Sequence, residues 1–376
     1  MLRTAIRATD DGFQADALPL VRPLAPTKRA ASLPDDFGAL SALTDCDLHG
    51  CEYLTRLPDC ISNLSGLTRL YARYCSRLLS LPACIGSLPA LATLDLTRCY
   101  SLSSLPDSIG GLAALTDLNL SGCTITTRLP DSIGNLVSLK SLNLSACTSL
   151  FGLPDSIGNL ALLTALNMCD CTVFYNCPSS IGNLAALAKL DLGNCDTLSS
   201  LPESIGGLTA LTWLNLSGLT VLRRLPNSIG HLVSLAKLNM MCCRTLKSLP
   251  ESIGALAALT YLCLAKCKRL TSLPDSIGAL RSLKVLDLAE CEALTALPDS
   301  IGDLSALSQL RLRSCMRLSE LPVCLGELAQ LTLLDLSFCS QLASLPDTLG
   351  KLALLTKIHT DGCRERLTQS AKALQQ

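Results

Sequence analysis

Cysteine has the greatest capacity for chemistry in this sequence, since 21 of the 376 residues carry a thiol. Thiols form disulfides, bind zinc or act as nucleophiles. The regular spacing of thirteen of them points instead to one structural position that is repeated along the chain. These cysteines are 24 residues apart or a multiple of it, at 51, 75, 99, 123, 147, 171, 195, 243, 267, 291, 315, 339 and 363, with Leu219 at the remaining place. We therefore expect free, buried thiols that act as small apolar groups and as weak donors to loop carbonyls.

The other requirements of metal binding and catalysis are missing from the sequence. No Cys-x-x-Cys pair is present, and the histidines are His49, His231 and His359, which lie far apart in the repeat. We expect no catalytic residues, no metal site, no cofactor and no small-molecule substrate, so the protein is predicted not to be an enzyme. Free thiols persist in a reducing compartment, which predicts an intracellular, cytoplasmic protein.

The same 24-residue interval separates leucine–proline pairs, which must mark the elements that position the cysteines. The pairs begin at 33, 57, 81, 105, 129, 153, 177, 201, 225, 249, 273, 297, 321 and 345, with Cys177 in place of one leucine. Fourteen units therefore span residues 33–368 without an insertion or deletion. A fixed period of this length predicts a solenoid, in which each unit buries its apolar face against its neighbours.

One unit, residues 129–152, predicts the elements. Leu139, Leu142 and Leu144 form the pattern L-x-x-L-x-L, typical of a short strand with its leucines pointing inward. The preceding segment, 130–139, is expected to form a short helix or 3₁₀ turns, because proline and aspartate favour a helix start. The fold class expected is thus an α/β solenoid, a curved horseshoe with a parallel β-sheet on the concave face and the helices or 3₁₀ turns on the convex face.

The glycine in the middle of that helical segment, Gly134, has a counterpart in thirteen of the fourteen units. It suits either a close approach between neighbouring turns or a left-handed backbone.

Outward strand positions carry two kinds of residue. A central row of short polar side chains is expected to hydrogen-bond along the sheet: Asp95, Asn119, Asn143, Asn167, Asp191, Asn215 and Asn239. Stacking does not require the irregular residues of the same face, and Trp, Tyr and Arg are the residues that most often anchor protein interfaces. The predicted partner-binding residues are Arg69, Tyr71, Arg73, Tyr74, Trp213, Lys237, Met241, Tyr261, Arg311, Arg313 and Phe338.

Charge is balanced overall but uneven along the chain. The formal net charge is zero, which gives no general attraction to nucleic acid or acidic lipid. The sequence has no apolar run of about 18 residues, so no membrane span is expected. Residues 223–284 nevertheless hold ten Lys and Arg against two acids, whereas residues 85–215 hold nine acids against four bases. An RNA-binding role for the basic stretch 223–284 is an alternative, although nucleic acid is not the expected partner.

The two ends depart from the repeat. Residues 1–32 are predicted to be a leader that is either disordered or a degenerate N-terminal cap. At the other end, Leu367, Ala371 and Leu374 fall on one helical face, so residues 369–376 would form the C-terminal end of a helical cap over the repeats of 33–368.

The motif L-x-x-L-x-L-x-x-C-x-x-L followed by L-P-x-S-I-G-x-L resembles the leucine-rich repeats of plant disease-resistance receptors and related intracellular plant proteins. It is also similar to repeats in effectors of plant-associated bacteria. No phosphate-binding G-x-x-x-x-G-K-[ST] loop is present. The resemblance implies a non-enzymatic protein–protein interaction module, which holds a protein partner of unknown identity on its concave face. Its context would be intracellular signal transduction or immunity-type recognition. The alternative is a secreted bacterial effector that binds a host protein through the same surface, with residues 1–32 as its export signal.

Overall fold

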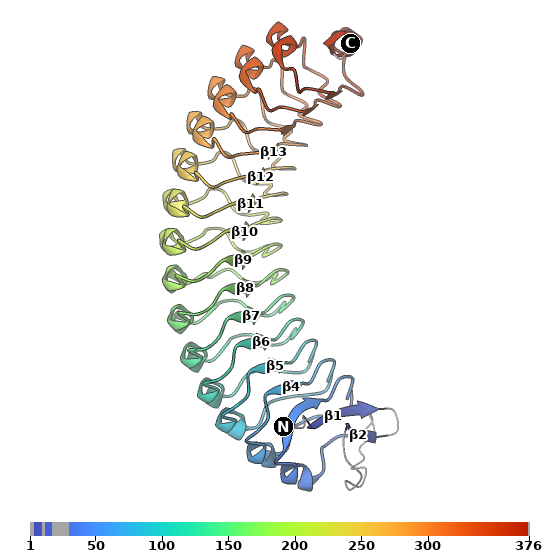
Figure 1. Cartoon of the computed structure of the whole chain (residues 1–376), viewed down its shortest axis with the longest axis vertical. Helices are drawn as coiled ribbons and strands as arrows, with labels where there is room; N and C mark the ends of the chain where they lie inside the picture. The colour runs from blue at the N-terminus through green and yellow to red at the C-terminus, as the bar shows by residue number, and fades with distance from the viewer. Residues whose placement is uncertain (1–3, 10–11, 17–29, 375–376) are drawn as a thin grey trace. The chain divides into compact units, whose positions relative to one another are not determined.

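The computed structural model describes residues 4–9, 12–16 and 30–374. The chain divides into two compact units, Met1–Leu187 and Ala188–Gln376, which are described in turn (Figure 1). In each unit short strands alternate with five-residue 3₁₀ turns, one of each per repeat, and Figure 1 shows the turns stacked in a column.

The first unit contains eight strands and seven 3₁₀ turns in its described part. The strands are β1 (Thr4–Thr9), β2 (Gly12–Asp16), β3 (Leu43–Asp47), β4 (Arg69–Tyr71), β5 (Thr93–Asp95), β6 (Asp117–Asn119), β7 (Ser141–Asn143) and β8 (Ala165–Asn167). The turns are η1 (Asp35–Ala39), η2 (Asp59–Asn63), η3 (Ala83–Ser87), η4 (Asp107–Gly111), η5 (Asp131–Asn135), η6 (Asp155–Asn159) and η7 (Ser179–Asn183).

The second unit contains eight strands, seven 3₁₀ turns and one helix in its described part. The strands are β9 (Lys189–Asp191), β10 (Trp213–Asn215), β11 (Lys237–Asn239), β12 (Tyr261–Cys263), β13 (Val285–Asp287), β14 (Gln309–Arg311), β15 (Leu333–Asp335) and β16 (Lys357–His359). The turns are η8 (Glu203–Gly207), η9 (Asn227–His231), η10 (Glu251–Ala255), η11 (Asp275–Ala279), η12 (Asp299–Asp303), η13 (Val323–Glu327) and η14 (Asp347–Lys351), and the helix is α1 (Glu365–Leu374).

Strand pairing follows the repeat. From β3 to β8, and from β9 to β16, each strand lies parallel to the next one along the chain. Each residue pairs with the residue 24 positions away, so that Leu142 of β7 lies between Leu118 and Leu166. The parallel sheet predicted from the L-x-x-L-x-L pattern is confirmed, and identical side chains form continuous rows because the period of the sequence equals the period of the stack.

The helical half of each repeat is a 3₁₀ turn, the second of the two predicted forms. In η5 the amide of Ile133 donates to the carbonyl of Pro130 at 3.0 Å, and the amide of Leu136 donates to Ile133 at 3.2 Å. Pro130 has an extended backbone and precedes the turn, whereas the sequence reading placed it at the first helical position. Ile133 and Leu136 are fully buried, as are Leu139 and Leu150 of the same repeat. Aliphatic side chains thus fill the core of every layer.

The recurring cysteines occupy the inward place just after the strand, as predicted. Cys147 donates its S–H to the carbonyl of Leu120 at 3.2 Å, and ten further cysteines of this row make the same bond to the preceding repeat. All 21 cysteines are free thiols. The carbonyl of Leu120 also accepts the amide of Cys123 at 3.0 Å, so the thiol is a second donor to this carbonyl and links neighbouring repeats.

The N-terminal strands lie before the first repeat. β1 pairs antiparallel with β2 and parallel with β3, so the sheet of the first unit extends past the first repeat. Residues 1–3, 10–11 and 17–29 of the predicted leader or cap lie outside the described residues. The function of residues 1–32 stays a prediction.

The C-terminal helix α1 packs on the last repeat. Leu367 and Ala371 are buried, one turn apart on the same helical face. The amide of Leu367 donates to the carbonyl of Arg364 at 3.0 Å. The guanidinium of Arg364 donates to the carbonyl of Ser340, in the previous repeat, at 3.2 Å.

Deleting residues 364–376 is therefore expected to lower the melting temperature, because it uncovers the last apolar layer. Burial of a leucine stabilises a fold by about 2 kcal/mol, which corresponds to several degrees in a protein of this size. Thermal unfolding followed by circular dichroism measures it. A melting temperature equal to that of the full chain would show that α1 is not a cap.

Candidate partner-binding face

The outward side of the sheet carries four rows of side chains in each unit. The first row comes from the first residue of each strand, the second row from its last residue and the third row from the residue two positions later. The fourth row is the next residue, which has a positive φ. We call these four rows the strand face. All predicted partner-binding residues belong to it.

The second row has a structural role in most repeats. The side-chain oxygen of Asn143 accepts the amide of Ser145, two residues ahead, at 3.0 Å. Ten repeats make this bond, through Asp47, Asp95, Asn119, Asn143, Asn167, Asp191, Asn215, Asn239, Asp287 and Asp335. It is an Asx turn that ends the strand. The row has a structural role, as predicted, but the prediction that its members bond along the sheet is wrong for these ten bonds, which lie within one repeat. The 2.8 Å bond from the Asn215 side-chain amide to Asp191 does run along the sheet.

The fourth row has a left-handed backbone in all fourteen repeats, with or without the Asx turn. Gly122 and Gly218 fill this place at φ 73°, where glycine has no steric cost. Tyr74 and Phe338 fill it at φ 57° and φ 62°. A side chain with a Cβ costs about 1–2 kcal/mol there.

Two predicted residues replace the residue that the fold prefers in the second row. Tyr71 and Arg311 take the place of the Asx residue, so their repeats lack its side-chain hydrogen bond to the amide two residues ahead. Tyr74 and Phe338 are two of ten residues other than glycine that have a positive φ in the fourth row, so this backbone conformation does not distinguish them. Residues that give up a structural bond persist where another role requires them.

In the first unit the structure brings four of the predicted residues together. The guanidinium of Arg73 lies over the ring of Tyr71 at 4.8 Å and pairs with Asp95 at 2.6 Å. Arg69 pairs with Asp45 on the neighbouring strand. Each arginine pairs with a carboxylate, so the positive charge of this cluster is partly neutralised. The arginine over Tyr71 also holds that ring in place.

Tyr74 is held between two side chains that the sequence reading did not include. His49 meets its ring edge-on at 5.2 Å between centroids, and Arg98 lies over it at 5.2 Å. His49 and Arg98 are one repeat before and after Tyr74. Alignment of the repeats indicates both residues as part of the strand face, because His49 lies in the third row and Arg98 in the fourth.

In the second unit three predicted residues are direct neighbours on adjacent strands. Trp213 of β10 pairs with Lys237 of β11, which pairs with Tyr261 of β12. Trp213 and Tyr261 are half-buried, and Lys237 is exposed. Burial, followed by the interaction with the Cys263 thiol, raises the pKa of Tyr261 to about 12, so its hydroxyl stays neutral.

Trp213 forms one wall of a shallow hollow of about 470 Å³, lined by Lys189, Thr212, Trp213, Ala236 and Lys237. Lys189 pairs with Trp213 from the other side, on β9. The prediction missed Lys189, although it lies 24 residues before Trp213 and the repeat places it in the same row. An indole between two lysines is suited to a group that is apolar at its centre and acidic at its edges.

The remaining predicted residues lie apart from this hollow. Arg311 of β14 pairs with Asp287 at 3.3 Å and donates to the side chain of Gln309 at 2.8 Å. Arg313 lies over the ring of Phe338 at 5.0 Å. Met241 is exposed in the third row after β11. The predicted residues thus form three groups, around Tyr71, Trp213 and Phe338.

The basic stretch 223–284 lies mainly off the strand face. Most of its charged residues come after the left-handed residue of a repeat, on the segment that leads to the next leucine–proline pair. We call this segment the loop ridge. Lys266, in the fourth row, pairs with Glu290 at 3.6 Å, and Lys268, on the loop ridge, pairs with Glu292 at 2.8 Å, each in the next repeat. Two of the ten bases of this stretch are thus already paired with carboxylates.

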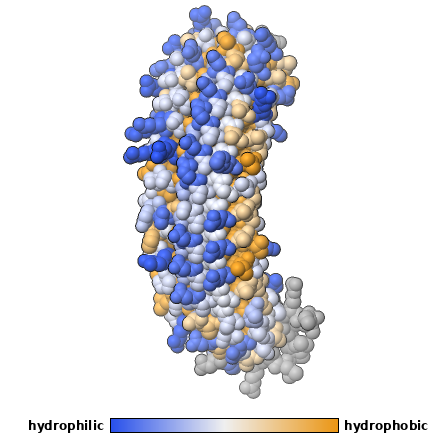
Figure 2. Space-filling model, turned by 90° about the vertical axis from the view of Figure 1, so that its left-hand side faces the viewer, coloured by the Kyte–Doolittle hydropathy of each residue, from blue (hydrophilic) through white to orange (hydrophobic). Residues whose placement is uncertain are grey.

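The loop ridge of the first unit carries exposed aromatic residues that the prediction did not include. Phe151 and Tyr175 stack at 6.2 Å, and Arg128 lies over Phe151 at 5.7 Å. They border a depression of about 250 Å³. On the 3₁₀ side, exposed apolar residues such as Val137, Leu162 and Val233 follow the turns, and Figure 2 shows apolar patches among hydrophilic ones there.

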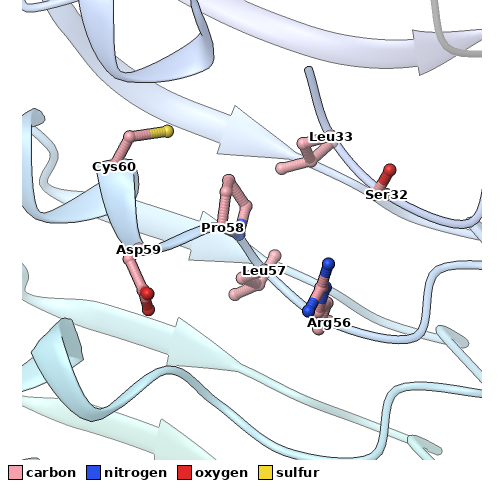
Figure 3. Close-up of a pocket in the computed structure, with 7 residues that line it drawn as sticks. All are labelled: Ser32, Leu33, Arg56, Leu57, Pro58, Asp59 and Cys60. Carbon is pink, nitrogen blue, oxygen red and sulfur yellow. The ribbon is translucent and has the colours of Figure 1, made fainter. Parts of the chain in front are cut away.

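A depression of about 450 Å³ at the start of the repeats lacks the convergence of a catalytic site. Ser32, Leu33, Arg56, Leu57, Pro58, Asp59 and Cys60 line it. Figure 3 shows the Cys60 sulfur and the Arg56 guanidinium at opposite ends, with the Asp59 carboxylate directed away from both. Nucleophilic catalysis requires a base within hydrogen-bond distance of the nucleophile. Among the described residues, no hydrogen bond joins the Cys60 thiol to a base.

Two further findings concern residues 4–9, 12–16 and 30–374. Among them, no group of three or more His, Cys, Asp or Glu could hold a metal ion. No helix in the same ranges is long and apolar enough to cross a membrane.

Comparison with known families decides the identity of the repeat. The family described as "Leucine-rich repeat region" matches residues 156–251 and 247–376, more than half of the chain. The chain belongs to the leucine-rich repeat family. A second description, "Leucine rich repeat", matches residues 89–148. Leucine-rich repeat domains are typically non-enzymatic, so the fold supports a protein-interaction module.

Several solved structures of leucine-rich repeat proteins are similar to this chain. An internalin from Listeria monocytogenes is 18% identical with a TM-score of 0.58, over 88% of this chain and 84% of that one. A leucine-rich repeat protein of Leptospira interrogans is 25% identical with a TM-score of 0.49, over 85% and 91%. The leucine-rich repeat domain of the type III effector XopL is 31% identical with a TM-score of 0.49, over 54% and 69%. No curated protein matches.

Proposed function

We propose that this leucine-rich repeat protein binds a protein partner on its strand face, as a non-enzymatic recognition module. The observation that carries the proposal is the set of residues that depart from the structural pattern of that face. Tyr71 and Arg311 replace the Asx residue of the second row, and Tyr74 and Phe338 place aromatic rings in the fourth row. Trp213 is the chain's one tryptophan, and it lies outward in a row that folding leaves free.

The partner encounters a rigid platform. The strands inside each unit, such as β10, are hydrogen-bonded on both sides, and the leucines beneath them are fully buried. A platform held this way loses little conformational entropy on binding, which favours affinity. Trp, Tyr and Arg dominate the binding energy of many protein interfaces.

We place this binding inside the cell, in a signalling or immunity-type recognition context. The 21 free thiols support a reducing compartment, since an oxidising one would convert accessible thiols such as Cys169 and Cys242. An effector role on a host protein would use the same face.

Affinity capture from a native lysate tests the strand face. We expect the combined variant Trp213→Ala, Tyr261→Ala, Arg311→Ala to lose at least tenfold of the captured partner, since each is a candidate hot spot. The matched control is His231→Ala, Asp303→Ala, Glu327→Ala, which changes three exposed residues at the ends of 3₁₀ turns in the same unit. Equal capture by wild type and the strand-face variant would show that the partner binds elsewhere.

A further inference from the structure

One edge of the second unit combines apolar and basic side chains without any acid. We define the start edge as the residues that lead from each 3₁₀ turn into the first position of the next strand, from β9 to β13. They are residues 188–189, 208–213, 232–237, 256–261 and 280–285. This edge includes Trp213, Tyr261 and the cations Lys189, Lys237, Arg281 and Lys284, and no Asp or Glu.

The four cations are not used by the fold. All four are exposed, and none forms an ion pair with a described residue, whereas Lys266 of the fourth row and Lys268 of the loop ridge do. The second-row acids of these strands are Asp191 and Asp287. The Oδ1 of Asp191 accepts the Gly193 backbone amide at 2.9 Å and the Asn215 side-chain amide at 2.8 Å, and Asp287 pairs with Arg311 at 3.3 Å. The positive potential of the edge is therefore left for a partner.

The hollow at Trp213 gives this edge a centre. It lies between Lys189 and Lys237, whose strands flank β10 in register, and Thr212 and Ala236 complete it. Adjacent strands are about 4.8 Å apart, so the two lysine backbones are separated by about 10 Å. A single apolar side chain on the indole leaves both lysines free to reach acidic groups on either side.

We propose that the start edge of β9–β13 binds an acidic segment of the partner, with an aromatic or aliphatic residue in the Trp213 hollow and carboxylates on both sides. This proposal rests on the function proposed above and names the partner's chemistry. From β9 to β13 the edge spans about 19 Å, the length of about six residues in extended conformation. The segment crosses the strands, and its acids pair with Lys189, Lys237 and Lys284.

A single-stranded nucleic acid fits the same edge less well. Its phosphates carry one charge per nucleotide, so its charge is not interrupted at the hollow lined by Trp213 and Ala236. A peptide places its carboxylates only where the lysines are. Carboxylates interrupted by an apolar residue match this pattern better than a continuous polyanion does.

Selection from a random peptide display library on the immobilised full chain tests the proposal, with Trp213→Ala protein for counter-selection. We expect enriched peptides that combine Asp or Glu with an aromatic or aliphatic residue. Because the chain has one tryptophan, its fluorescence then measures binding of a selected peptide directly. Lys189→Glu and Lys237→Glu are each expected to weaken binding at least tenfold, and Lys237→Arg to retain it.

The matched control is Lys357→Glu, an exposed lysine in the same row on β16. It should leave peptide binding unchanged. Enrichment of neutral or basic peptides, equal weakening by all three charge reversals, or a stronger Trp213 response to single-stranded oligouridine would overturn the acidic segment. If partner capture still depended on the strand face, the proposed function would stand without the acidic segment. If capture did not depend on the strand face, both proposals would be wrong. No enrichment over Trp213→Ala protein would also reject the site.

Discussion

Raising the pH from about 8 to about 10 is expected to destabilise the protein steeply. Burial raises the pKa of Cys99, Cys147 and Cys171 from an ordinary value of 9.0 to about 12. Between these values the unfolded chain loses its thiol protons while the folded chain keeps them. The folded state binds more protons in this window, so the free energy of unfolding falls as the pH rises. Below about pH 8 both states are protonated and stability is constant.

The size of the effect follows from the number of thiols. Each buried thiol removes about 1.4 kcal/mol for every pH unit above its unfolded pKa. Three thiols thus account for about 4 kcal/mol at pH 10, a large part of a typical folding free energy of about 5–15 kcal/mol. Other cysteines of the same row also have a raised pKa through burial, which adds to the loss.

Urea unfolding under reducing conditions, repeated at several pH values, measures this dependence. In the variant Cys147→Ala the free energy of unfolding should fall less steeply with pH, by the contribution of about one proton. The variant should also be modestly less stable at pH 7, because a buried group is removed. A constant urea midpoint up to about pH 10, or an unchanged slope in Cys147→Ala, would contradict the account of neutral, buried thiols.

Gly134→Ala is expected to destabilise the fold by about 3 kcal/mol. A Cβ at Gly134 would lie 2.4 Å from the carbonyl oxygen of Ser156 and 2.7 Å from its Cβ, in the next 3₁₀ turn. Both contacts belong to the tightly fixed part of the neighbouring repeat, so neither can move aside without moving the backbone. Its φ is not positive, and the close approach alone therefore explains the glycine.

Gly152→Ala is the matched control in the same repeat. Its Cβ would lie 3.5 Å from the nearest atom, the carbonyl oxygen of Asn176, which is an ordinary contact. We expect a change within about 0.5 kcal/mol, with a small gain from the restricted unfolded chain. Thermal unfolding of both variants tests the argument. Similar melting temperatures for the two variants would show that the turns are not closely packed at Gly134.

Much of the fold follows from the sequence because each feature recurs in every repeat. The L-x-x-L-x-L leucines set the strand and its register, and the cysteine row marks the inward turn. Two details depended on the structure. Pro130 precedes the 3₁₀ turn, since the closed i to i+3 bonds begin at its carbonyl. The Asx bond of Asn143 is made within its own repeat, which requires the turn geometry to be known.

The candidate site was only partly predictable. Trp213, Lys237 and Tyr261 are conspicuous as irregular residues of one row, and the structure places them side by side. Lys189 is conspicuous only once the row is aligned and the hollow is seen. Ion pairs are a property of the folded chain, so the sequence could not separate the paired Lys266 from the unpaired Lys237.

Photo-crosslinking from two positions of one repeat tests the central claim most directly. A photoreactive benzoylphenylalanine replaces Met241, on the strand face after β11, or His231, at the end of η9 on the 3₁₀ side. Both residues are exposed, and they belong to the same repeat. The partner captured by the wild-type chain is expected to crosslink at position 241 and not at 231. Crosslinking at 231, or equal yields at both positions, would contradict binding on the strand face.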